Sequence, residues 1–210
     1  MTRALALLDL LEDLERKGTS VIDLVTDGQP LLPWRLYPGE SGIFDRGTRC
    51  QVYYHSHGSD LEAGHFHTVR LFANHTAHLV AISMTSGGWP QALFTLNLWA
   101  IGDAYESAAN LRRYVRRFHL REQVGPPPLV RFANLIFQVF GPEMERLQEE
   151  KMVALADHRA LHPDRDVFED RSLEILSRVE VDLRARAGDV VSTISRCSTG
   201  EKTACPARCN

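Results

Sequence analysis

The sequence has few of the features that mark exported or membrane-spanning proteins. Its 210 residues include only four cysteines, and no run approaches the roughly 18 apolar residues that a membrane-spanning helix needs. The opening stretch, MTRALALLDLLEDLERKG, is apolar only briefly and then acidic, unlike the continuous apolar segment of a signal peptide. We therefore expect a cytoplasmic protein, with no membrane partner and no disulfide framework.

The chain also lacks an excess of basic charge. Its formal net charge is −3 and its pI is near 6.3. Nucleic acids and membrane surfaces attract basic proteins, so this balance argues against a nucleic-acid partner. Five arginines between Arg112 and Arg121 are a local exception. We interpret them as a solvated helix face, with contact to a phosphate or to an anionic substrate as the alternatives.

Hydrophobic periodicity separates helical regions from strand regions. Residues 2–17 have helical spacing, and residues 18–48 are rich in proline and glycine, which predicts a loop with room for one short strand. Alternating apolar and polar residues predict four strands, at 49–57, 65–72, 77–84 and 91–97. Helical spacing returns at 103–120, 129–140, 141–161 and 167–177. This order predicts an α+β fold, with an antiparallel four-stranded β-meander flanked by helices.

Composition divides the chain into three regions. Residues 1–29 are expected to form an N-terminal helix and linker, and residues 30–183 a single α+β domain that contains the histidine cluster. Residues 184–210 are rich in Arg, Ser, Thr and Gly and contain three of the cysteines. This last region is predicted to be a flexible tail.

Histidine is the residue type that the sequence concentrates. Six of its nine histidines lie between His55 and His78, and four of them form two His-x-His pairs, His55/His57 and His65/His67. Side chains two residues apart on a strand point to the same face, so each pair shares one face. A hairpin with His57 opposite His65 also places His55 opposite His67. The four imidazoles would then form a patch about 5 Å by about 7 Å.

Imidazoles at this spacing are typical of a mononuclear transition-metal site. Neutral imidazole binds zinc, iron and copper, so the pattern predicts a divalent transition metal held by the four paired histidines. Glu62, in the connecting loop, could add a carboxylate ligand or act as a general base, and Tyr53 or Asn97 could orient a small-molecule substrate.

Three other readings of the histidine cluster stay open. Four histidines that saturate the ion would indicate a non-enzymatic metal- or ligand-binding module, whereas an open coordination position would indicate an enzyme. A metal-free polar pocket and a solvated histidine patch are the remaining alternatives. The sequence determines neither the substrate nor the oligomeric state.

The predicted register also describes the surroundings of the four histidines. Extended to the third strand, it places His78 about 13 Å from His67, outside the site. The same face of the third and fourth strands would supply a largely apolar pocket floor. Its predicted members are Val80, Ile82, Met84, Leu93, Thr95 and Asn97.

Two sequence resemblances accompany this pattern. HSHGSDLE, residues 55–62, partly resembles the first cupin motif, but Val69 stands where cupins have glycine and residues 85–97 contain no histidine. A YYHxH strand, GHFH, HLVAIS, a glycine turn, LFTLN-W and a later SLEILS together resemble an uncharacterised bacterial family classed as a domain of unknown function. In that family Asn-Arg-Trp usually follows LFT, and here Leu98 replaces the arginine. The resemblance implies that the histidine motif is a family feature, and it implies no activity.

Overall fold

The computed structural model describes residues 2–58, 61–102 and 104–198. In chain order, its elements are α1 (Arg3–Arg16), α2 (Val21–Thr26), β1 (Ile43–Asp45), β2 (Cys50–His55), β3 (Gly64–Leu71), β4 (Thr76–Met84), β5 (Pro90–Leu96), α3 (Leu98–Ile101), α4 (Ala108–Arg116), the 3-10 turn η1 (Glu122–Val124), α5 (Pro127–Leu161), β6 (Ile175–Glu180) and α6 (Leu183–Ser198).

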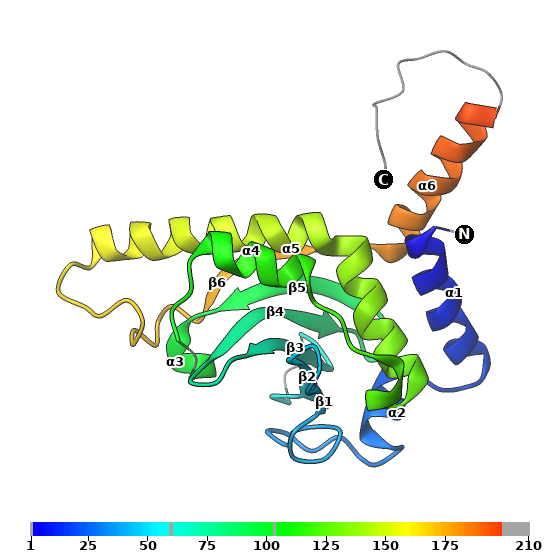
Figure 1. The fold of residues 1–210 in the computed structure, drawn as a ribbon, viewed down its shortest axis with the longest axis horizontal. Coiled ribbons are helices and arrows are strands. Elements are labelled where there is room, and N and C mark those ends of the chain that lie inside the picture. The colour runs from blue at the N-terminus through cyan, green and yellow to red at the C-terminus, as the bar shows by residue number, and fades with distance from the viewer. Residues whose placement is uncertain (1, 59–60, 103, 199–210) are drawn as a thin grey trace.

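The strands form one antiparallel sheet in the sequential order β1-β2-β3-β4-β5-β6 (Figure 1). The predicted α+β class is confirmed, but the predicted strand number of four was wrong. β1 is a short strand within the predicted loop 18–48, which had room for one but was not counted in the sheet, and β6 lies where helical spacing predicted a helix. Pairing with β5 and a hydrogen bond between the hydroxyls of Thr95 and Ser177 (2.6 Å) hold β6 in the sheet. Tertiary pairing therefore overrides the local helical pattern.

Helices cover one face of the sheet, and α5 runs along it (Figure 1). Alternate residues of β2 are buried, as expected for a strand with one face on the core. Side chains from the strands and from α1, α2, α4, α5 and α6 belong to one buried apolar cluster. The N-terminal helix therefore shares its core with the sheet.

Helix α5 is kinked near its middle. Phe140 has non-helical dihedral angles (φ −112°, ψ 18°), two residues before Pro142. Proline has no N–H to donate and its ring clashes with the preceding turn, so the helix axis changes direction there (Figure 1). The two helices predicted at 129–140 and 141–161 are thus the two halves of α5.

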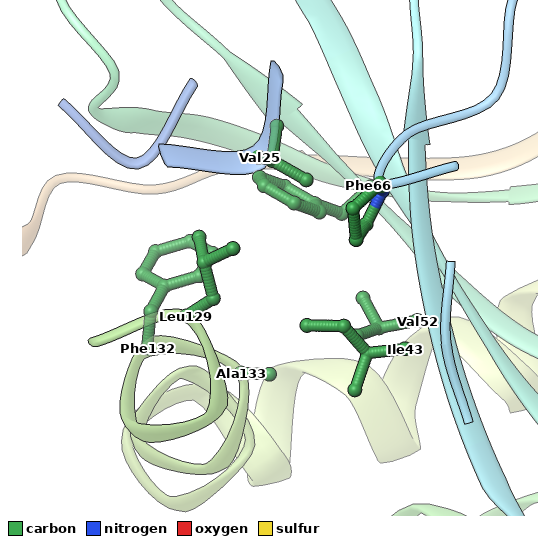
Figure 2. A pocket seen from close by; sticks show the side chains of 8 residues that line it. Val25, Ile43, Val52, Phe66, Leu129, Phe132 and Ala133 are labelled. Carbon is green, nitrogen blue, oxygen red and sulfur yellow. The ribbon is translucent and has the colours of Figure 1, made fainter. Parts of the chain in front are cut away.

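A small cavity lies between α5 and the sheet (Figure 2). Its volume is about 10 Å³. The residues that line it are Val25, Pro38, Ile43, Val52, Phe66, Leu129, Phe132 and Ala133. A cavity that holds about one water-sized sphere, with an apolar lining, belongs to core packing and does not bind a substrate.

Two further helix predictions need correction. Helix α4 begins at Ala108, where the side chain of Ser107 accepts a hydrogen bond from the Asn110 amide, and not at the expected start near residue 103. The segment 183–198, expected to be frayed, forms α6, and Arg184 contacts Glu12 of α1 at 2.7 Å. Cys205 and Cys209 lie outside the described residues, so the flexible tail stays a prediction there.

The arginine cluster is largely used in ion pairs within the fold. Arg112 and Arg116 of α4 contact Glu145 of α5 at 3.3 and 2.8 Å. Arg121 contacts Asp45 of β1 at 2.6 Å. These pairs attach α4 and the segment after it to α5 and β1, which agrees better with a structural helix face than with an anion-binding one.

Within the described ranges, no helix combines the length and the apolar character needed to cross a bilayer.

Candidate metal site

The β2–β3 hairpin carries the histidine pairs on the sheet face opposite the helices. His55 pairs with His65, and Tyr53 pairs with His67. The predicted register was therefore wrong by two residues, because β2 ends at His55 and His57 lies in the loop that follows. A slip of two residues leaves each side chain on its predicted face, so the histidines still meet.

Gly64, the first residue of β3, allows the strands to approach closely at this point. It adopts φ +150°, and a Cβ atom there would lie 2.4 Å from the carbonyl oxygen of His55. Only glycine tolerates both the backbone conformation and the contact. The glycine of the GHFH motif thus places His65 beside His55.

The Nε2 atoms of the four paired histidines form a chain of close contacts. The Nε2···Nε2 distances are 2.9 Å for His55–His57, 3.0 Å for His65–His67 and 3.3 Å for His55–His67. One ligand atom from each of His55, His57 and His65 lies within 4.8 Å of the other two. The structure therefore brings together a histidine group that could hold a metal ion, with His67 next to it.

These separations match those between ligands of one ion. For metal–nitrogen bonds of about 2.0–2.1 Å, neighbouring nitrogens lie about 2.8–3.0 Å apart at a right angle and about 3.3–3.4 Å apart at a tetrahedral angle. The three separations given above fall in this range. Each contacting pair thus needs little movement to act as neighbouring ligands of one ion.

Glu62 orients His65 by contacting Nδ1, the ring nitrogen that does not face the other histidines. Its Oε1 lies 2.5 Å from His65 Nδ1, and its Oε2 accepts a hydrogen bond from Ser83 Oγ at 2.5 Å. The Ser83 hydroxyl in turn accepts one from Gln91 Nε2 at 3.0 Å. A carboxylate on Nδ1 fixes the tautomer that leaves the Nε2 lone pair for a metal.

His78 holds His67 in a similar way, which the sequence analysis did not anticipate. His78 Nε2 lies 2.8 Å from His67 Nδ1, so placing His78 about 13 Å from His67 was wrong. The register next to the β3–β4 turn causes the difference, because His78 pairs with Val69, two residues from His67, and not with Leu71. Beyond that pair β4 has a bulge, in which Leu79 and Val80 together face Thr68 of β3. The Thr68 hydroxyl holds the bulge by donating to the Val80 carbonyl (2.7 Å) and accepting from the Val80 amide (3.2 Å).

The same bulge changes the pocket floor. The extra residue reverses the alternation along β4, so Ala81 pairs with His67 and Ser83 with His65. The predicted floor residues Val80, Ile82, Met84 and Leu93 instead belong to the core cluster beneath the helices. On β5 the histidine face carries Ala92 and Phe94, the partners of Ser83 and Ala81.

Tyr53 and Asn97, the other two residues predicted for the site, differ in whether they contact the histidines. Tyr53 stacks on His67, with ring centroids 4.8 Å apart and an interplanar angle of 17°. Asn97 caps α3 and donates to the carbonyl oxygens of Val167 (2.7 Å) and Leu173 (2.9 Å). Trp34, which the sequence did not assign to the site, stacks on His57 with centroids 4.3 Å apart and is 71% exposed. Only its proximity in the folded chain links it to the site.

A pocket of about 690 Å³ opens beside the histidines. Its lining comes from β2, β3, β4, β5, β6, α3 and the loop after β2: His55, His57, Leu61, Glu62, His65, His67, Ser83, Gln91, Phe94, Leu96, Ala100, Glu174, Ile175, Arg178 and Glu180. Small-molecule sites have this size and this mixture of apolar walls with a few polar groups.

Burial keeps His55, His57, His67 and His78 neutral. It lowers the pKa of His55 to about 4, with the neighbouring imidazoles adding to the effect, and it lowers the pKa of His57. The pKa values of the more deeply buried His67 and His78 fall well below the usual range for the same reason. Burial acts to raise the pKa of Glu62, but hydrogen bonds from His65 and Ser83 lower it overall. Near neutral pH His55, His57 and His67 thus offer unprotonated imidazoles, which are the form that binds metals.

The fold and the site together define an α+β protein with a metal-competent histidine cluster on the open face of its sheet. The chain belongs to the family described as Domain of unknown function (DUF6969), whose model matches residues 1–181. Comparison with curated proteins and with solved structures finds no match.

Proposed function

We propose that this protein binds one divalent transition-metal ion, zinc, iron or copper, through His55, His57 and His65, with His67 as the fourth imidazole. The close approach of His55, His57 and His65, whose ligand atoms all lie within 4.8 Å of one another, carries this proposal, and His67 Nε2 lies 3.0 Å from His65 Nε2 and 3.3 Å from His55 Nε2. The Nδ1 contacts of His65 and His67 support it, because both leave Nε2 as the coordinating atom. The lowered pKa values of His55, His57 and His67 support it further, since these imidazoles have no proton to displace at neutral pH.

We further propose that the ion serves a reaction on a small molecule. All four imidazoles line the pocket, so an ion among them would face the space where a substrate can enter. A metal in such a position supplies Lewis acidity or an activated water. Tyr53 and Trp34 would stiffen the imidazoles on which they stack.

Glu62 remains a candidate general base, because it lines the same pocket. Its contacts with His65 and Ser83 give it an orienting role at the same time. The hydrogen bonds of Asn97 to two backbone carbonyls favour a structural role over substrate contact.

The second candidate function is a non-enzymatic module in which four histidines saturate the ion. The observation that favours it is the position of His67 Nε2, which lies 3.0 Å from His65 Nε2 and 3.3 Å from His55 Nε2. Visible absorption of the cobalt-loaded protein separates the two candidates. Azide or cyanide that alters the cobalt bands in wild type would establish an open position and support the enzyme. A spectrum unchanged by either anion, with tetrahedral intensity that falls in His67→Ala, would support the saturated module.

A further inference from the structure

The pocket wall opposite the histidines is built by β6. Cross-strand pairing defines two rows across the sheet: Tyr53, His67, Ala81, Phe94 and Arg178 form one, and His55, His65, Ser83, Ala92 and Glu180 form the other. Ala81 is the small residue of the first row, and Ser83 and Ala92 are the small residues of the second, with larger side chains on both sides of them. The hollow between the histidines and the residues of β6 therefore follows from the small residues at its centre.

Arg178 is the cation of this wall. Among the described lining residues it is the only lysine or arginine, and its guanidinium carbon lies 5.8 Å from the ring centroid of Phe94. Its Nε donates to Glu180 Oε1 at 2.9 Å. Within the described part of the chain, no hydrogen bond occupies its two terminal nitrogens. A guanidinium held by Nε presents those nitrogens as a pair that matches a carboxylate.

The distance between the two ends of the pocket suits a short molecule. His67 and Arg178 are three strand spacings apart in one row, which is about 14 Å between backbones. Both side chains project from the sheet on the face that lines the pocket, and the Phe94 ring lies between them in the row. A molecule a few atoms long can thus reach from the metal to the guanidinium across an apolar surface.

The acidic residues of the pocket limit the negative charge that a molecule bound at this wall can carry. Glu180 already contacts Arg178, and Glu174 also lines the pocket. These carboxylates would repel a second negative charge on a bound molecule. The wall is therefore better matched to a single carboxylate than to a phosphate dianion.

We propose that the substrate is a small organic monocarboxylate. Its carboxylate binds the terminal nitrogens of Arg178, its apolar segment lies against Phe94 and Leu96, and its other end reaches the metal. This inference rests on the proposed metal function, and it assigns Arg178 as the residue that selects the charge of the substrate.

Three linear hydroxamates of equal length test the assignment. The hydroxamate end anchors each compound to the metal, and the far end carries a carboxylate, a carboxamide or an ammonium group. Calorimetric titration of zinc-loaded wild type, Arg178→Gln and Arg178→Lys would give the affinities. Arg131→Gln, at an exposed position of α5, is the matched control. Elemental analysis after each titration verifies that the ion stays bound.

We expect wild type and Arg131→Gln to bind the carboxylate compound at least about tenfold more tightly than the carboxamide. Arg178→Gln should lose this preference, and Arg178→Lys should keep part of it. Equal affinities in wild type, a preference that survives Arg178→Gln, or tighter binding of the ammonium compound would overturn the assignment while leaving the metal proposal intact. A protein that retains no zinc would overturn both.

Discussion

The four histidines of the site differ in what holds them. Glu62 contacts Nδ1 of His65 and His78 contacts Nδ1 of His67, whereas His57 is braced by the stacked Trp34 ring. A metal-binding imidazole coordinates through Nε2, and a hydrogen bond to its Nδ1 holds the ring in the orientation that coordination needs. The affinity of the site should therefore depend on residues that do not themselves coordinate.

Replacing Glu62 by glutamine tests this dependence. The amide keeps the size of the side chain but removes the negative charge beside His65, so the affinity for zinc should fall by about 10- to 100-fold. Competition with a chromophoric chelator would measure it. Glu150→Gln, on the exposed side of α5, is the matched control and should bind as wild type does. An unchanged affinity in Glu62→Gln would show that the carboxylate does not support the ligand.

At the scale of single residues, the alternation of side chains along a strand made part of this site predictable. Two His-x-His pairs on neighbouring strands keep their side chains on one face when the register shifts by an even number of residues. The cluster was therefore found although the predicted register was wrong by two residues. The contact between His78 and His67 could not be predicted, because it depends on the register next to the β3–β4 turn, which pairs His78 with Val69. The sequence pattern did not fix that register.

At the scale of elements, one buried carboxylate connects segments that are distant in sequence. Asp45 of β1 is fully buried, and it accepts hydrogen bonds from the Arg121 backbone amide (2.8 Å) and from the Arg121 guanidinium Nη2 (2.6 Å). It also accepts one from the Gly47 amide at 2.8 Å. The hydrogen bond with Arg121 is the main reason that the pKa of Asp45 lies far below its usual value.

Asp45→Asn should lower the free energy of unfolding by about 1–3 kcal/mol at neutral pH. A depressed pKa in the folded state stabilises the fold above the unfolded pKa of about 3.9, and the contribution is lost as the pH falls below it. Urea unfolding from pH 7 to pH 3 should therefore show the difference between wild type and variant shrinking below about pH 4. A difference that stays constant over this range would contradict the role given to the charge.

The elements were predicted unevenly, for physical reasons. The strands β2 to β5 and the two halves of α5 have strong periodicity, and the sequence located them. β1 has three residues, too few to show a period, and β6 is held by its partner β5 and by the Thr95–Ser177 contact. Pairing with the adjacent strand stabilises edge strands of this kind, and a local sequence pattern holds no information about that pairing.

At the scale of the whole molecule, α1 and the sheet share one buried cluster, so they should unfold together. Leu7 of α1 has no exposed surface, and Leu7→Ala should lower the free energy of unfolding by about 2–5 kcal/mol. Far-ultraviolet circular dichroism and tryptophan fluorescence would follow the same urea transition. Separate transitions for the two probes would show that α1 is not part of the cooperative unit. Leu8→Ala, at a partly buried position of the same helix, is the control and should cost less.

The metal content of protein purified without a histidine tag tests the central claim most directly. Elemental analysis after reconstitution with zinc, iron or copper should find about one equivalent of a single metal. His55→Ala and His65→Ala should each lose most of it, whereas His119→Ala, outside the site, should not. Less than about 0.2 equivalents of any transition metal in the wild-type protein, or full occupancy in both site variants, would contradict the account.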